Sequence, residues 1–331
     1  MKKSLSVVFT LLIALLIFVS CDEAPPKEYD PKTIPFTMEF YDMGGYVIFN
    51  NAPDSLRYSI DGGELKKLET SHLLVGDCQK LTIYAARPMT SEDKLFSIDC
   101  LADCYIYGNI MSLVAGESFK NRATVHANAF RGLFKNNRYI DIHPIYDLYL
   151  PATTLSENCY YEMFSGCDNL TRIPELPAEQ LADNCYAYMF AGCTALEEVP
   201  DLTCMNLAKG CYCGMFSGCT GLKEAPELFA EEMKDSCYES MFQNCSGLTK
   251  APILRAETLA TDSYKGIFAG CGKLNSIINL AIHPGSNMDD WAKDVAATGT
   301  IYVAEGTIPN WSYSNYVPAN WQLAEYKEPN L

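Results

Sequence analysis

The sequence predicts a multi-domain protein made of a small β-sandwich, an α/β solenoid of 26-residue units and an α/β cap. Three observations carry this prediction. Nearly identical segments recur along the second half of the chain, a stretch before them alternates apolar and polar residues in twos, and a tryptophan-rich segment follows them. With 331 residues, the chain has room for two or three domains.

The repeat begins at a Cys-Tyr pair and returns without insertion. The pairs start at Cys159, Cys185, Cys211 and Cys237, and Ser263 begins a fifth unit, so the period is 26 residues. A fixed period of this length is typical of a solenoid and lies within the leucine-rich-repeat range of about 20–29 residues. We therefore expect a solenoid across 151–280, preceded by a degenerate repeat or N-terminal cap at 116–150.

Each unit has two predicted parts. An extended segment carries regularly spaced leucines, for example Leu170 and Leu176. In the other part, Cys159, Met163 and Cys167 recur at the spacing of one face of a helix. One column then holds residues that tolerate the left-handed turn after a helix, namely Gly166, Gly192, Gly218, Asn244 and Gly270. The sequence therefore predicts one helix per unit.

The repeated cysteines are open to three interpretations: buried thiols, disulfides or metal ligands. In a helix over 159–167, Cys159 and Cys167 would lie about 12 Å apart along the axis, too far for a disulfide. Cysteines in one column of neighbouring coils would have parallel rather than converging Cβ directions. Zinc sites need four ligands at spacings such as C-x2-C, which this chain lacks. We favour buried, reduced thiols in the core and expect no metal and no cofactor.

Units of the form CYxxMFxGCxxLxxxPxLxAxxL resemble those of the BspA-like leucine-rich-repeat surface proteins of Bacteroidetes. The resemblance runs from about Leu150 to Leu280, and segments 103–113 and 288–300 extend it on both sides. It implies a surface-exposed, non-catalytic protein that takes part in adhesion or partner binding. Ligands differ among such proteins, so the resemblance assigns no ligand residue.

The N-terminus has the pattern of a secretory signal. Lys2 and Lys3 precede an apolar run that ends at Ser20, so 1–20 is the predicted signal peptide. The sequence around Cys21 resembles a bacterial lipobox with Phe18 in place of the usual aliphatic residue, which implies cleavage before Cys21 and its lipidation. An ordinary signal peptide is the alternative. The acidic residues after Cys21 resemble the surface-export signal of Bacteroidetes lipoproteins, and 21–33 reads as a tether.

The segments flanking the repeat have their own patterns. In 34–115, Phe36, Met38 and Phe40 alternate with other residues, and Asp61-Gly62-Gly63 is a hairpin signal, so we expect an immunoglobulin-like sandwich. Cys100 and Cys104 could pair there across a turn. In 281–331, a helix over 287–297 and strands at 300–303 and 321–326 predict a C-terminal cap, which three tryptophans would seal.

Charge and motif content exclude several functions. The formal net charge is −16, and loss of Lys2 and Lys3 with the signal would make it −18. Such a chain is repelled by nucleic acid and by anionic lipid headgroups, so we expect membrane contact only through the lipid anchor at Cys21. No catalytic motif is found, and Asp141 and His143 are better explained as one face of a solvated strand. We expect no enzyme and no catalytic residue.

The candidate binding residues are acidic. Stacked coils would align Glu175, Asp201 and Glu227, with three further acids close by; the full set is Glu175, Glu197, Glu198, Asp201, Glu224 and Glu227. Either water screens these charges, or a cation or a basic partner uses them.

The predicted function is that of a non-catalytic lipoprotein of the outer membrane, facing the cell surface, which binds a host or extracellular macromolecule. The alternative is a glycan-binding accessory lipoprotein for polysaccharide capture. The tyrosines that recur every 26 residues from Tyr160 are better explained as core residues than as a platform on which a glycan stacks. The alternative therefore needs other aromatic rings at the surface, among Tyr161, Tyr188, Trp311, Tyr313 and Trp321.

Overall fold

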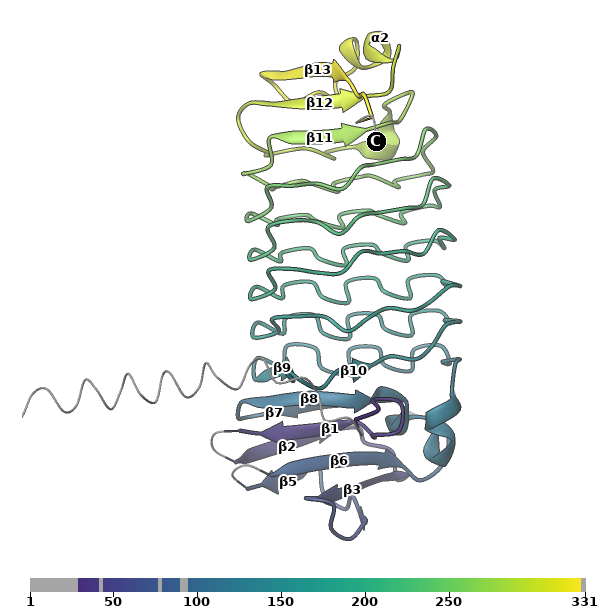
Figure 1. Cartoon of the computed structure of the whole chain (residues 1–331), viewed down its shortest axis with the longest axis vertical. Coiled ribbons are helices and arrows are strands. Elements are labelled where there is room, and N and C mark those ends of the chain that lie inside the picture. The colour runs from purple at the N-terminus through teal and green to yellow at the C-terminus, as the bar shows by residue number, and fades with distance from the viewer. Residues whose placement is uncertain (1–28, 42–43, 77–78, 90–94, 329–331) are drawn as a thin grey trace, which may run out of the picture.

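A computed structural model describes residues 29–328, with gaps at 42–43, 77–78 and 90–94. The predicted signal peptide, the lipidation site Cys21 and most of the tether lie outside these residues. Within the described residues, no helix has the length and apolar character needed to cross a bilayer. The molecule is elongated, with two β-sheets at one end, a stack of coils in the middle and a third sheet at the other end (Figure 1).

The N-terminal end contains a seven-stranded and a three-stranded sheet. The larger sheet has the order β10-β8-β1-β6-β3-β4, with β9 also paired to β8, and the smaller has the order β5-β2-β7. The strands are β1 (Thr37–Phe40), β2 (Gly45–Asn50), β3 (Leu56–Ile60), β4 (Lys66–Lys67), β5 (His72–Val75), β6 (Lys80–Ala85), β7 (Ser97–Cys100), β8 (Cys104–Asn109), β9 (Ile140–Ile142) and β10 (Leu148–Tyr149). Buried side chains of both sheets, such as Met38 and Phe49, join one core.

This arrangement corrects the immunoglobulin-like prediction. An immunoglobulin domain packs antiparallel sheets of about four and three strands. Here β9 and β10 come from the segment that enters the coils, and both pair in parallel with β8. The two 3-10 helices η1 (Ile110–Leu113) and η2 (Gly116–Asn121) follow β8. The N-terminal sheets and the first coils therefore share strands and one continuous core.

The predicted helices of the repeat are wrong. Residues 158–167 and their equivalents form consecutive turns, which we call the turn ribbon. Every fourth residue of the ribbon has a positive φ, as at Asn158, Glu162 and Gly166, with 53°, 54° and 76°. A left-handed residue in every turn is incompatible with an α-helix, in which all residues are right-handed.

Hydrogen bonds explain why the turn ribbon is stable without a helix. Alternate N–H groups donate within the coil to the carbonyl three residues earlier, as Met163 does to Tyr160 over 3.1 Å. The N–H groups between them donate to the next coil, as Phe164 does to Met189 over 2.8 Å. Each buried donor therefore has a partner, and half of the partners belong to the neighbouring coil.

The opposite side of each coil is extended but forms no continuous sheet. The β-pairing between neighbouring coils is reduced there to isolated bridges, such as that of Leu202 with Leu228. One column on this side holds Pro174, Pro200, Pro226 and Pro252. Proline has no N–H to donate to a ladder. Among the coils, strands appear on this side in the first, as β9 and β10, and in the last, where Ile278 of β11 (Ser276–Asn279) stands in place of the proline. The prediction of an α/β solenoid is therefore wrong in both its helices and its sheet.

The C-terminal end is a small parallel sheet. Strand β11 pairs with β12 (Gly299–Val303), which pairs with β13 (Trp321–Glu325), and the short helix α2 (Ile308–Ser312) lies beside them. The helix predicted over 287–297 is absent. The 3-10 helix η3 (Ser286–Met288) begins this segment, and positive φ angles at Asp290 and Asp294 continue the turn ribbon.

Candidate binding surface

The extended side of the coils places all six predicted acidic residues on three successive coils. Glu175, Glu197, Glu198, Asp201 and Glu224 are exposed, and Glu227 is half-buried. We call this set of six the acidic stripe. Each residue lies beside the residues 26 positions before and after it in the neighbouring coils. Charged side chains of successive coils are therefore adjacent.

Two members of the acidic stripe are paired by lysines of the following coil. Lys223 Nζ lies 2.6 Å from Glu197 Oε2, and Lys250 Nζ lies 2.9 Å from Glu224 Oε2. The hydrogen bond that each lysine donates to its glutamate raises the pKa of the lysine. All four side chains are largely exposed, so these pairs are screened by solvent. The chain therefore compensates part of the predicted repulsion itself.

The rest of the acidic stripe is less compensated. Asp201 Oδ1 accepts a hydrogen bond from the N–H of Glu227 over 3.0 Å, which aligns the two residues. Arg255 approaches Glu227 only to 3.8 Å. Within the described part of the chain, Glu175 and Glu198 form no ion pair. The stripe thus keeps negative charge between its two lysine pairs.

Apolar side chains that the sequence did not single out adjoin the acidic stripe. Met205 is 62% exposed and Phe229 is 37% exposed. The bridge between Leu202 and Leu228 places them on neighbouring coils, just beyond Asp201 and Glu227. The sequence carried a signal for Met205, because its column otherwise holds Glu179, Glu231 and Glu257, whereas the column of Phe229 is mixed and gave none.

An acidic hollow of about 640 Å³ continues this surface. Its walls include Glu231, Glu232 and Glu257, together with Arg255. The Arg255 guanidinium, in the wall of the hollow, lies 6.0 Å from the centre of the Phe229 ring, so the hollow adjoins Phe229. We call Met205, Phe229 and the hollow the apolar margin of the acidic stripe.

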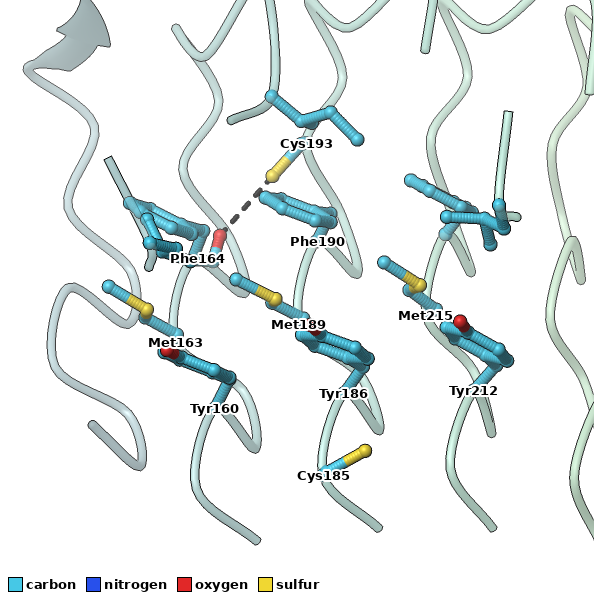
Figure 2. Close-up of a cluster of buried hydrophobic side chains, with 14 of the residues drawn as sticks. Tyr160, Met163, Phe164, Cys185, Tyr186, Met189, Phe190, Cys193, Tyr212 and Met215 are labelled. Atoms are coloured by element: carbon cyan, nitrogen blue, oxygen red, sulfur yellow. Dashed lines mark hydrogen bonds between the residues drawn. The ribbon is translucent and has the colours of Figure 1, made fainter. Parts of the chain in front are cut away.

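The tyrosine column is core. The rings from Tyr160 to Tyr238 stack at centroid distances of 5.6–5.9 Å, and their planes are within 9° of parallel. A phenylalanine column from Phe164 to Phe242 stacks beside them in the same way (Figure 2). These rings are buried, so they offer no platform to a glycan.

Of the five rings that the glycan alternative requires, two are buried. Trp311 is fully buried and Trp321 is 7% exposed, and both indole N–H groups donate to backbone carbonyls. Trp291 and Trp311 continue the phenylalanine column beyond Phe268. Tyr313 is 93% exposed.

The cysteines of the repeat face the interior. In the second cysteine column, each thiol donates to a phenylalanine carbonyl of the preceding coil, as Cys193 does to Phe164 over 3.2 Å (Figure 2). Burial raises the pKa of these thiols, for example to about 12 at Cys271. Among the described residues, no group of three or more His, Cys, Asp or Glu side chains is placed to hold a metal ion.

Asp141 and His143 do not form a proton relay. The Asp141 carboxylate accepts bonds from the hydroxyl and the N–H of Thr171. His143 Nδ1 accepts the N–H groups of Ile145 and Tyr146, so the ring nitrogen nearest the backbone is already engaged. Burial lowers the pKa of His143.

Comparison with known proteins adds no assignment: no protein-family model, no curated protein and no solved structure matches this chain.

Proposed function

We propose that this protein is a non-catalytic binding protein whose acidic stripe and apolar margin bind an extracellular protein with a basic, partly apolar surface. The observation that carries the proposal is that Met205 and Phe229 are exposed on the two coils that carry Glu198, which has no ion pair among the described residues, and Glu227, which Arg255 approaches only to 3.8 Å. Exposed apolar groups next to uncompensated charge are typical of a surface that gains both affinity and orientation on binding.

Charge and burial would contribute differently to such a complex. The overall charge of −16 would attract a basic partner and speed the encounter, in a salt-dependent way. Burial of Met205 and Phe229 would supply the less salt-dependent part of the affinity. The resemblance to BspA-like surface proteins, the proposed lipid anchor at Cys21 and a location on the outer membrane, facing the cell surface, fit a partner outside the cell.

A displayed peptide library tests this proposal without knowledge of the natural partner. We expect the purified protein to select peptides in which Lys or Arg alternates with large apolar residues. The selected peptides should bind at least tenfold more weakly to the Glu198→Gln/Asp201→Asn variant and to Phe229→Ser. The matched control is Asp54→Asn/Glu64→Gln, which removes the same charge from the N-terminal sheets and should bind as the wild type does. Selection without basic residues, or equal losses in the control, would contradict the proposal.

A second candidate, glycan binding, is favoured by an aromatic cluster on the N-terminal sheets. Tyr41 and Tyr105 stack at 4.4 Å, and His143 lies 5.2 Å from Tyr105 and 4.5 Å from Tyr146. Tyr41 is 46% exposed, and burial of the rest of its ring raises its pKa to about 12. A glycan array probed with the wild type and with Tyr41→Ala separates this candidate from the first, because Tyr41 follows β1 of the N-terminal sheets and is not part of the acidic stripe. Glycan binding that needs Tyr41 but not Asp201 would favour the second candidate.

A further inference from the structure

Cys100 and Cys104 meet where the two N-terminal sheets join. Cys100 is the last residue of β7, in the three-stranded sheet, and Cys104 is the first residue of β8, in the larger sheet. A three-residue turn connects them, and their Sγ atoms are 3.6 Å apart. Both side chains are completely buried. Two sulfurs therefore face each other across the point at which the chain passes from one sheet to the other.

The environment of this pair differs from that of the repeat cysteines. Each thiol of the second repeat column is directed to a backbone carbonyl, at 3.0–3.2 Å. Cys100 and Cys104 are instead directed to each other, and Cys100 Sγ also lies 3.4 Å from Asn137 Oδ1. Asn137 follows the turn ribbon of the first coil, so the pair also touches that coil.

We propose that Cys100 and Cys104 are a disulfide site, oxidised while the chain folds by exchange with a small-molecule or protein disulfide. The thiolate of one cysteine attacks the oxidant's disulfide, forms a mixed disulfide and releases one thiol. The thiolate of the other cysteine then attacks the protein sulfur of that mixed disulfide and releases the second thiol. The two cysteines lose two electrons and two protons, and the oxidant is reduced to two thiols.

The geometry needs only a local movement for this bond. A disulfide requires a sulfur separation of about 2.05 Å, so the two Sγ atoms must approach by roughly 1.5 Å. Rotation of two side chains on either side of a short turn can supply such a shift. The bond would join β7 to β8 and thus fix the two sheets to each other beneath the first coil.

Burial determines when the bond can form. Thiol–disulfide exchange needs a thiolate and access for the oxidant. Neither is present at a fully buried pair, and burial also raises the pKa of Cys104. The bond must therefore form before the two sheets close, and the folded protein should protect whichever state it was given.

Refolding of the full chain in glutathione disulfide, compared with refolding in dithiothreitol, tests the proposal. After denaturation and alkylation, trypsin should release residues 95–120 as one peptide that contains both cysteines. From the oxidised sample, we expect this peptide to carry no alkyl group and to weigh two hydrogen atoms less than the same peptide with two free thiols. From the reduced sample, we expect both cysteines to be alkylated. A folded, reduced sample that is exposed to glutathione disulfide should give the doubly alkylated peptide.

The variants decide whether the bond matters to the fold. The wild type should unfold at a higher temperature when oxidised than when reduced, and Cys100→Ser and Cys104→Ser should each abolish that difference. Cys204→Ser is the control, because Cys204 is a partly exposed cysteine outside the pair, and it should keep the difference. If a variant does not fold, the peptide masses of the wild type are sufficient to decide whether the disulfide forms. A doubly alkylated peptide after oxidative refolding, or a bond from Cys100 to Cys167, would overturn the proposal.

Discussion

The thiol of Cys219 donates a hydrogen bond to the carbonyl oxygen of Phe190, in the preceding coil, over 3.1 Å. The same carbonyl already accepts the N–H of Cys193. The thiol is therefore the second hydrogen-bond donor to this buried carbonyl oxygen, which water cannot reach. This contact repeats at Cys167, Cys193, Cys245 and Cys271, which gives cysteine a role that alanine, with no S–H group to donate, could not fill.

Replacement of this thiol should weaken the stack. Cys219→Ala removes a fully buried sulfur and leaves one acceptor position of the Phe190 carbonyl empty, so we expect the free energy of unfolding to fall by about 2 kcal/mol. Urea denaturation under reducing conditions measures it. Cys204→Ala is the control, since its sulfur is partly exposed, and it should cost less than about 0.5 kcal/mol. Equal costs for the two variants would show that the interior bond contributes nothing.

The left-handed positions of the turn ribbon should tolerate asparagine better than alanine. Gly218 has a φ of 76°, and a Cβ there would meet its nearest atom, the Gly192 Cα, at an ordinary 3.7 Å. The cost of Gly218→Ala is therefore backbone strain alone, about 1 kcal/mol. Gly218→Asn should cost about half as much, in keeping with the asparagine at position 244 of the same column. Thermal unfolding compares them with Gly285→Ala, an open site with an extended φ of −167°, which should be neutral.

Alkaline pH should unfold the protein through its buried thiols. Burial raises the pKa of Cys159, Cys237 and Cys271 from the usual value near 9 to about 12. As the pH rises, the unfolded state therefore loses its thiol protons before the folded state does. The contribution of these thiols to the free energy of unfolding is complete below pH 9 and falls as the pH rises towards 12. Between pH 9 and 10 we expect a loss of roughly 1 kcal/mol per thiol, measured by urea denaturation with a reductant present.

A single substitution checks the source of that loss. Cys159→Ala should be less stable than the wild type at pH 7 but should lose about 1 kcal/mol less between pH 9 and 10. A stability that stays level from pH 8 to 10, or a pH slope that Cys159→Ala does not change, would rule out the thiols as the cause.

The lysine pairs of the acidic stripe should contribute little to stability. Lys223 and Glu197 are both 62% exposed, so a double-mutant cycle of Lys223→Gln and Glu197→Gln should give a coupling smaller than the cost of Gly218→Ala. In 1 M NaCl, where the screening length is about 3 Å, the coupling should vanish. A coupling that persists in high salt would mean that the pair is structural rather than a solvated surface contact.

The sequence predicted which residues are buried far better than it predicted their backbone. The 26-residue period placed Tyr160, Met163 and Phe164 in the interior, where they lie. The helix failed because a spacing of four fits a repeated four-residue turn as well as it fits a helix of 3.6 residues per turn. Asn158 and Gly166 carried the missing signal, since both belong to columns rich in residues that accept a positive φ.

The acidic stripe shows a different limit. Glu197 and Lys223 occupy one column, so the period alone could have paired them. The acidic residues considered without their column neighbours gave no sign of that pairing. The exposure of Phe229 could not be predicted, because its column holds proline, threonine, arginine and alanine and so has no consistent polarity.

The direction of the bonds between coils gives the molecule a donor end and an acceptor end. At the donor end, the N–H groups of Tyr264, Gly266, Phe268 and Gly270 are accepted by carbonyls of 287–293. At the other end, the N–H group of Ile98, in β7, donates to the carbonyl of Leu133, in the turn ribbon of the first coil. The last turns of the ribbon are followed by β12, α2 and β13, and the first coil adjoins the N-terminal sheets. The two ends of the coil stack are therefore chemically different, and a further coil would meet N–H donors at one end and carbonyl acceptors at the other.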